Sequence, residues 1–335
     1  MTSRWSQLTY SSFGRAGGSG WGFGPSVNLQ DGDIQLAQKY VRGDIWPVQK
    51  IDDFLNASEV AELPARFEYI PLPGRGGEHK SALYVQTVPA GRDGSGRQGN
   101  SFTHILINHD VEMRQGGEYP IAAFRSPDLL TPFLSKNVDA VELAQLEDVP
   151  RRNPSFNVEF AWTLVREMGE DRFCYVLEAL DAISGAARVP VLLVENAQQA
   201  FIWLSVISSL TSPDMARQQM RLSTFERAAS FDGQNFYDDR GRVIVAAPVE
   251  DKKLFALRDD VHCIDTTAPP REYAPQTVWS ECAQWVFDEL GSVAALLVEW
   301  EKQPASPLES LGRPLEKVRT RRENEKSNSS YQPFH

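Results

Sequence analysis

The sequence lacks most of the features that identify a disulfide-bonded, metal-binding or membrane protein. Its 335 residues contain only three cysteines, Cys174, Cys263 and Cys282, at spacings that suit neither a disulfide framework nor a metal cage. No apolar run reaches the ~18–20 residues needed to cross a bilayer. The N-terminus also lacks the cationic-then-apolar order of a secretory signal. These absences predict a cytoplasmic protein without membrane contact.

Catalytic and cofactor-binding motifs are missing as well. The chain contains no G-x-S-x-G nucleophile elbow and no H-E-x-x-H zinc motif. Gly74 and His79-Lys80-Ser81 come within one residue of a phosphate-binding P-loop. The alternating residues that follow indicate a strand, however, whereas a P-loop runs into a helix. Glu195 ends an apolar run, as does the acidic residue that holds a magnesium ion in NTPases. The chain has no phosphate-binding loop with which Glu195 could act. We therefore expect no cofactor, no metal and no enzymatic activity.

Positive charge is scarce. The chain has 34 lysines and arginines against 45 aspartates and glutamates, for a formal net charge of −11. This balance opposes binding to a phosphate backbone. Residues 303–335 hold few apolar side chains and are predicted to form a disordered tail. The alternative for this tail is nucleic-acid contact through its basic residues, which are Arg313, Lys317, Arg319, Arg321, Arg322 and Lys326.

The hydrophobic period changes near the middle of the chain. Before residue 150, β-branched and aromatic residues alternate in short runs, which indicates strands. After it, apolar residues recur mainly at helical spacing. We predict an α+β protein with a β-rich N-terminal domain (1–150) that carries a glycine-loop hairpin, followed by a helix-rich α/β domain (151–302). The expected strands cover 5–10, 66–71, 82–88, 102–108, 189–196, 220–227 and 242–248, and the expected helices cover 33–43, 156–168, 171–183, 197–210 and 277–301.

A glycine-rich stretch occupies residues 14–24, with six glycines. Glycine allows positive φ and close backbone approach, so we expect a tight loop beside another backbone or a ligand. A flexible hairpin connection is the alternative. Both interpretations place an irregular connection at 14–24.

The most strongly specified stretch is residues 81–110, where two strand-like runs flank a loop with glycines at 91, 94, 96 and 99. This loop and the strand after it hold a dense cluster of polar residues. The backbone N–H groups of such a loop can bind an anion, and arginines add bidentate contacts to a ligand or a partner. The candidate binding residues are Gly91, Arg92, Asp93, Arg97, Gly99, Asn100 and His104.

Two other accounts of this cluster are open. Asp93 and His104 would suit acid–base chemistry. Alternatively, the cluster locks the loop in one conformation, with an arginine paired to Asp93 and with Asn100 satisfying backbone groups. His104 is then a hydrogen-bonded histidine at the edge of the core. His104 and His109 do not share a metal, because residues an odd number of positions apart on a strand face opposite sides.

Four segments resemble a known bacterial family. QLTYSS at 7–12, GRDGSGRQGNSFTHIL at 91–106, FRSPDLL at 124–130 and RLSTFERAAS at 221–230 occur in the order found in GTPase-associated protein one. The chain resembles its N-terminal domain of the second type and the middle domain behind it. The resemblance implies a non-enzymatic adaptor or platform encoded beside a GTPase in a bacterial conflict or antiviral defence system. It does not imply GTPase activation, so neither Arg92 nor Arg97 is assigned as an arginine finger.

These observations favour a protein-interaction module of a GTPase-linked defence assembly. Family members are usually longer, so we expect a shorter binding module here. Its partner would be a GTPase or another defence component, contacted through the 91–104 loop and the neighbouring 14–24 loop. The alternative is an enzyme that binds or processes a small anion or nucleotide with Asp93 and His104. A third possibility is a structural subunit that buries the 277–301 helix against a partner.

Overall fold

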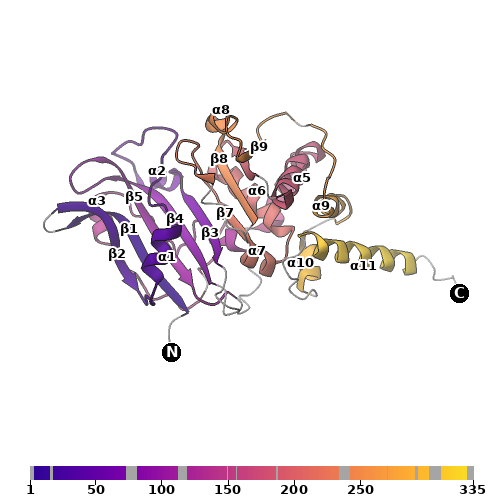
Figure 1. The fold of residues 1–335 in the computed structure, drawn as a ribbon, viewed down its shortest axis with the longest axis horizontal. Helices are drawn as coiled ribbons and strands as arrows, with labels where there is room; N and C mark the ends of the chain where they lie inside the picture. The colour runs from indigo at the N-terminus through magenta and orange to yellow at the C-terminus, as the bar shows by residue number, and fades with distance from the viewer. Residues whose placement is uncertain are drawn as a thin grey trace.

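The computed structural model shows an α+β fold built on one mixed sheet (Figure 1). The strands are β1 (Trp5–Arg15), β2 (Gly18–Val27), β3 (Arg66–Leu72), β4 (Ser81–Arg92), β5 (Gln98–Asn108), β6 (Val189–Val194), β7 (Met220–Ser223), β8 (Arg242–Pro248) and β9 (Val261–Asp265). The structure describes residues 4–15, 18–72, 81–111, 119–148, 150–155, 157–185, 188–233, 242–269, 271–290, 293–301 and 311–329.

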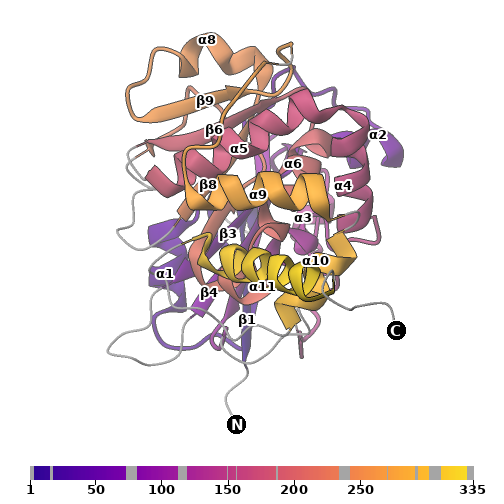
Figure 2. The same ribbon diagram turned by 90° about the vertical axis from the view of Figure 1, so that its right-hand side faces the viewer.

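Helices flank this sheet on both faces. In the described part of the chain they are α1 (Asp33–Tyr40), α2 (Ala57–Glu62), α3 (Ser135–Asp139), α4 (Val158–Glu167), α5 (Glu170–Gly185), α6 (Ala197–Ser209), α7 (Pro213–Gln219), α8 (Lys252–Phe255), α9 (Val278–Glu289), α10 (Val293–Glu301) and α11 (Arg313–Ser329), with 3-10 turns η1 (Pro120–Ala123) and η3 (Val249–Asp251). Figure 2 shows α5, α9 and α11 layered in front of the sheet. None of the described helices combines the length and apolar character required to cross a bilayer.

The two sequence regions share a single sheet with strand order β2-β1-β5-β4-β3-β7-β8-β6-β9. The strands of the N-terminal region pair antiparallel, while β7, β8, β6 and β9 pair parallel. The junction is the antiparallel pair β3–β7, where Glu68 lies opposite Ser223. Strands from before and after residue 150 therefore belong to one continuous sheet. The division into domains at that residue stays a prediction.

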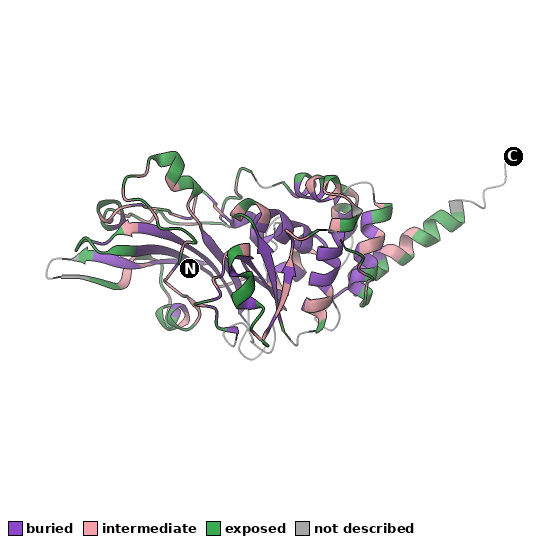
Figure 3. Ribbon diagram, turned by 90° about the horizontal axis from the view of Figure 1, so that it is seen from above, coloured by how far each residue is buried: buried purple, intermediate pink, exposed green. Residues whose placement is uncertain are grey.

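Apolar residues are buried on both faces of the sheet (Figure 3). On β5, Phe102 and Leu106 belong to the large cluster packed under α4, α5, α6 and α9, whereas Ile105 and Ile107 belong to a smaller cluster under α1. This alternation agrees with the period of 2 in the sequence. In the parallel region, α8 covers the second face with Phe255. Long strands with two buried faces explain why 82–88 and 102–108 were recognisable from sequence.

The glycine-rich stretch is mainly strand, so an irregular loop over 14–24 is wrong. The stretch does contain the connection between β1 and β2, which pair antiparallel as the hairpin alternative expected. β2 begins at Gly18 and pairs with β1, with Gly22 opposite Ser11 and Gly20 opposite Phe13. A Cβ atom on Gly24 would lie 2.2 Å from the Phe13 ring, so the glycine makes room for an aromatic side chain. Ala16 and Gly17 lie outside the described residues, as do residues 73–80 with the P-loop-like Gly74, His79 and Lys80.

The C-terminal region also differs from its prediction. The expected helix at 277–301 is two helices, because α9 gives way at Leu290 to extended backbone and α10 begins at Val293. Residues 313–329 form α11 rather than part of a disordered tail. Leu311, Leu315 and Val318 are buried, and this spacing makes a narrow apolar stripe. The distal turns of α11 are exposed (Figure 3).

Candidate interaction surface

The predicted 91–104 loop is a tight hairpin whose tip, residues 93–97, joins β4 to β5. Asp93 organises this tip. Its carboxylate accepts hydrogen bonds from the backbone N–H and hydroxyl of Ser95 at 2.9 and 2.7 Å, and from the backbone N–H and Nε of Arg97, both at 2.9 Å. Burial raises the pKa of Asp93, but these hydrogen bonds outweigh it and hold the pKa at about 2. The internal lock therefore accounts for the carboxylate.

The glycines of the hairpin serve its backbone geometry. Gly91 and Gly99 have φ of +73° and +92°, a region that favours glycine. Gly91 lies opposite Asn100 where the β4–β5 register shifts, as in a β-bulge. A Cβ atom on Gly91 would lie 3.2 Å from the Phe133 ring. Close packing of β4 thus explains Gly91 without a bound ligand.

Asn100 and His104 lie in the sheet, away from the tip, and both are buried. The Asn100 Oδ1 accepts a hydrogen bond from the backbone N–H of Ser12 at 3.1 Å and helps to join β5 to β1. The His104 Nδ1 accepts a hydrogen bond from the backbone N–H of Leu130 at 3.2 Å. Burial lowers the pKa of His104 to about 4, with Asp128 acting in the opposite direction. His104 is a neutral core histidine at physiological pH.

This placement contradicts an acid–base pair of Asp93 and His104. The register sets Gln98 opposite Arg92 at the tip and His104 opposite Gln86, six positions along the strand. At ~3.3 Å per residue the two side chains are separated by roughly 20 Å, far beyond hydrogen-bond reach. The seven candidate residues therefore form no common site. Arg92 and Arg97 are exposed at the tip and Asp93 is buried within it, whereas Asn100 and His104 are buried in the sheet.

Arg92 points from the tip to a different part of the chain. Its Nη1 donates to the backbone O of Gly96 at 2.7 Å, and its Nη2 donates to Asp53 Oδ2 at 2.6 Å. Gln98 Nε2 donates to the same carboxylate oxygen at 3.4 Å. Arg92 holds the pKa of Asp53 below its ordinary value through this hydrogen bond. The hairpin therefore anchors the irregular segment that contains Asp53.

That segment, residues 44–56, is irregular and is held mainly by side chains from elsewhere. Arg227 donates to the backbone O atoms of Trp46 and Pro47 at 2.8 and 2.9 Å, and Arg92 holds Asp53. At and next to these anchors the segment presents large apolar side chains to solvent. Trp46 is 59% exposed and Phe54 is 92% exposed. Aromatic residues exposed together on a fixed backbone are typical of a binding surface.

A groove of about 720 Å³ lies beside segment 44–56. Residues at the ends of β6, β7 and β8 form the opposite wall, and residues of α2 also line the groove. The connections after neighbouring strands β6 and β8 lead in opposite directions, to β7 and to β9. Ligands of parallel sheets bind at such a point, outside the carboxyl ends of the strands. The apolar residues that line the groove include Leu55, Leu63, Val194, Phe225 and Pro248.

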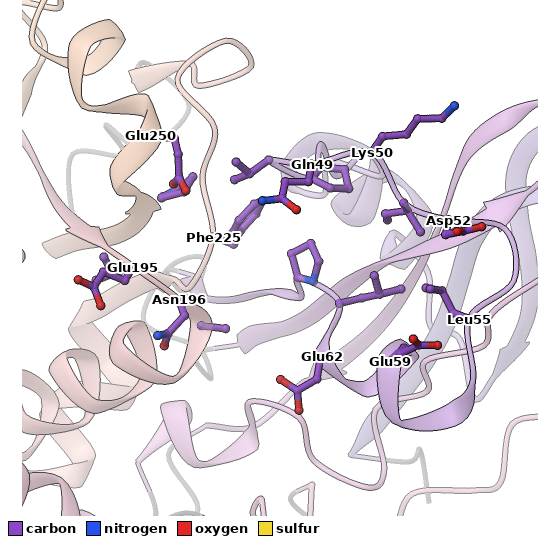
Figure 4. A pocket seen from close by; sticks show the side chains of 18 of the residues that line it. Gln49, Lys50, Asp52, Leu55, Glu59, Glu62, Glu195, Asn196, Phe225 and Glu250 are labelled. Carbon is purple, nitrogen blue, oxygen red and sulfur yellow. The ribbon is translucent and has the colours of Figure 1, made fainter.

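Acidic side chains surround this groove. Its described lining carries five carboxylates and one lysine, Lys50, all of them exposed. Figure 4 shows Glu195 and Glu250 on the side of β6 and β8, and Asp52, Glu59 and Glu62 on the opposite side. We call these five residues the acidic rim. No cluster of histidine, cysteine or carboxylate side chains that could hold a metal ion occurs within the described residues.

Glu195, considered above as a magnesium ligand, has a local role. The Gln199 Nε2 donates to its carboxylate at 3.0 Å, and the Glu195 backbone N–H donates to Gln199 Oε1 at 3.1 Å. The Asn196 side chain accepts from the backbone N–H of Gln199 at 2.9 Å and caps α6. These contacts fix the start of α6 at the edge of the groove.

Sequence reasoning missed the groove and segment 44–56. The groove joins residues from 47–64 with residues from 194–197, 224–225 and 248–250, which only the fold brings together. A weak signal was present, because Trp46, Val48 and Phe54 lie in a stretch without regular periodicity. The basic residues of 313–326, expected in a disordered tail, lie on α11. There Arg321 and Arg322 pair with Glu299, Lys326 with Glu289, and Arg319 with Glu323.

Comparison with known proteins finds a family model that matches the N-terminal part of the chain and two longer relatives. Residues 4–149 match the model of GTPase-associated protein 1, N-terminal domain type 2. Two Mycolicibacterium smegmatis proteins, from strains MKD8 and ATCC 700084 / mc(2)155, are 34% and 33% identical to the chain over 258 residues. Both carry the provisional name of ESX-1 scaffolding and assembly protein SaeB. The match covers 75% of this chain and 29% of each relative, so the chain spans less than a third of their length. The family match ends at residue 149, and the middle-domain assignment stays a prediction.

Proposed function

We propose that the chain is a non-enzymatic scaffold or adaptor module, because residues 4–149 match the model of GTPase-associated protein 1, N-terminal domain type 2. It holds a protein partner against segment 44–56 and the adjoining groove. The relatives' name as scaffolding and assembly proteins supports this class of role. The chain works in the cytoplasm as a binding platform, without chemistry of its own.

One observation carries this proposal: Phe54 is 92% exposed although its neighbours are anchored. Asp53 is held by Arg92, and Leu55 lines the groove. Burying a phenylalanine side chain contributes about 1.5–3 kcal/mol, so a partner that covers Phe54 gains this free energy without first ordering the backbone. Trp46 offers a second anchor of the residue type enriched in binding hot spots.

The hairpin tip belongs to this surface in two ways. Arg92 positions Asp53, and Arg97 is exposed at the outer end of the hairpin with its guanidinium bound to Asp93. We propose Arg92 and Arg97 as flanking contacts, with Asp93, Gly91, Gly99, Asn100 and His104 as the framework that supports them. The double variant Arg92→Ala with Arg97→Ala is expected to fold and to capture the partner more weakly.

The partner is proposed to be a GTPase or a protein that assembles with one, because the domain is named for association with a GTPase. The names of the two relatives refer to ESX-1 assembly. A role in bacterial conflict or antiviral defence is a hypothesis drawn from the resemblance alone. It would be supported if the co-purified partner proved to be encoded beside a defence GTPase.

Affinity purification followed by size-exclusion chromatography with light scattering tests the proposed role. The tagged wild-type chain is expected to elute in a complex of defined stoichiometry. Trp46→Ser with Phe54→Ser is expected to elute alone and folded, while Phe160→Ser, which removes another exposed phenylalanine on α4, keeps the complex. Elution of the wild-type chain without any partner would contradict a scaffold role.

A further inference from the structure

The acidic rim determines which kind of partner segment fits the groove. Asp52, Glu62 and Glu250 are exposed residues that line the groove, together with Glu59 and Glu195 (Figure 4). Like charges concentrated around a low-dielectric floor raise the local concentration of ligands of opposite sign. A phosphate-bearing ligand is disfavoured for the same reason. The formal charge of −11 on the whole chain acts in the same direction.

The arginines nearest the groove are already engaged by other groups. Arg227 forms a bidentate pair with Asp251 and donates to the backbone O atoms of Trp46 and Pro47. Arg125 donates to the backbone O of Leu63 at 3.0 Å, and Arg92 pairs with Asp53. These cations build the walls of the groove. Among the rim carboxylates, Asp52, Glu59 and Glu195 accept hydrogen bonds from nearby neutral groups. All five rim residues are exposed, so their negative charge can still act on a cation from outside.

The floor of the groove adds a second requirement. Val194 and Pro248 are buried at the strand ends, and Leu55, Leu63 and Phe225 are half-buried around them. An apolar floor under a charged rim is complementary to a peptide in which an apolar residue is flanked by charged residues. The volume of about 720 Å³ lies within the range of pockets that hold a ligand of a few side chains. A short peptide segment fits this space better than a folded surface does.

We propose that the groove binds a cationic segment of a protein partner, in which an aliphatic or aromatic side chain enters the floor and flanking lysines or arginines meet the acidic rim. This inference rests on the proposed scaffold role and specifies the chemistry of the partner. Carboxylates on both sides of the groove favour basic residues on both sides of the apolar one. Segment 44–56, with Trp46 and Phe54, continues the contact beyond the groove.

Fluorescence anisotropy with defined peptides tests the proposal. The probe is a labelled Gly-Lys-Arg-Leu-Phe-Lys-Arg-Gly peptide, and its counterpart carries glutamate at every basic position. The wild-type chain is expected to bind the cationic peptide at least about tenfold more tightly than the acidic one, with an affinity that falls as salt is added. Equal binding of the two peptides, or no binding of either, would overturn the cationic assignment.

Charge-reversal variants locate the site. Glu62→Lys with Glu250→Lys reverses two rim charges and is expected to weaken binding by about tenfold or more. Glu167→Lys with Asp288→Lys makes the same change of net charge at the ends of α4 and α9, outside the groove, and is expected to bind as the wild type does. Equal losses in both variants would contradict a local site. Glu62→Gln with Glu250→Gln gives a milder second test if the reversed pair fails to fold.

The outcomes separate this inference from the proposed function. If the Trp46→Ser and Phe54→Ser variant loses the native complex but the peptides do not discriminate by charge, the scaffold role stands and the cationic partner is wrong. If the cationic peptide binds at the rim while no native complex forms, the groove chemistry stands and the scaffold role is contradicted.

Discussion

At the level of single residues, several polar side chains that look functional in the sequence have structural roles in the fold. Asp93, Asn100 and His104 each have a local partner that explains their residue type. The sequence pattern correctly indicated a structured hairpin, because glycine, aspartate and asparagine have well-defined preferences in turns. It could not show whether the resulting hydrogen bonds point inward or outward, because this depends on Ser12, Ser95 and Leu130.

His104 gives the clearest pH-dependent prediction. Its pKa is about 4 in the folded protein against 6.5 for an ordinary histidine. The unfolded chain therefore binds a proton as the pH falls below 6.5, while folded His104 stays neutral down to about pH 4. The contribution of His104 to the free energy of unfolding is therefore fully present above pH 6.5. It falls as the pH is lowered towards 4, by up to about 3 kcal/mol.

Urea unfolding at pH 7 and at pH 5 checks this prediction in the wild type and in His104→Gln. The glutamine variant retains an acceptor for the Leu130 N–H and does not titrate. Its loss of stability between the two pH values should be the smaller one, because carboxylates contribute equally to both proteins. Identical losses would show that His104 is not the group responsible.

Arg92 is predicted to act by ordering segment 44–56 rather than by stabilising the fold. Its pair with Asp53 is exposed, and exposed ion pairs contribute little to global stability. Arg92→Ala should leave the melting temperature nearly unchanged and should accelerate amide hydrogen exchange around Asp53. Arg97→Ala, which releases Asp93 instead, should leave exchange in segment 44–56 unchanged. Protection of that segment in both variants would show that other contacts suffice to hold it.

At the level of secondary structure elements, the junction of β3 and β7 is held by a buried ionic network. Arg42 contacts Glu226 at 2.6 Å and Glu68 at 3.0 Å, and Arg66 contacts Glu68 at 3.2 Å. Burial raises the pKa of Glu68, but attraction to Arg42, Arg66 and Arg221 outweighs it and lowers the pKa. Glu68→Gln leaves these cations with one fewer counter-charge in a buried site.

We therefore expect Glu68→Gln to lower the free energy of unfolding by about 3–5 kcal/mol, the usual cost of breaking a buried ion pair. Chemical denaturation measures this change. Asp128→Asn, which breaks the exposed pair with Arg151, is the matched control and should have little effect. A small effect of Glu68→Gln would mean that water reaches the network and compensates for the lost charge.

Gly312 at the start of α11 provides a second element-level prediction. Its φ is +99°, and a Cβ atom there would lie 2.8 Å from the backbone of Trp279 on α9. Gly312→Ala should introduce about 1–3 kcal/mol of strain. This strain should weaken the packing of α11 against α9. Faster hydrogen exchange at Leu315 and Val318 with the sheet unchanged would confirm it. Unaltered exchange would show that α9 shifts to accept the methyl group.

Sequence patterns predicted the long elements and missed those that depend on tertiary contacts. Helix α4 has a clear 3.6-residue period, α5 and α6 are long and rich in apolar residues, and β6 is a continuous apolar run. β2 was hidden by its glycines, which are compatible with a loop and with close strand packing. α11 was hidden because its apolar stripe is narrow and its surface is highly charged. The acidic groove had no local signature, because its walls come from distant parts of the chain.

For the whole molecule, one sheet of nine strands in the described residues places the N-terminal region, which matches the family model, in contact with the parallel region. The groove lies where they meet, with α2 and segment 44–56 on one side and the ends of β6, β7 and β8 on the other. A surface made from both regions depends on the integrity of the junction. This arrangement links the buried network at Glu68 to the proposed binding of a partner.

Photo-crosslinking from position 54 tests whether segment 44–56 binds a partner in the cell. A benzoyl-phenylalanine at Phe54, with the same substitution at Phe160 as the control, is introduced into the chain in its host cell. The account predicts crosslinks from position 54 to a specific protein partner through a peptide rich in lysine or arginine, and none to that partner from position 160. Crosslinks to that partner from position 160 alone would contradict a binding surface at segment 44–56.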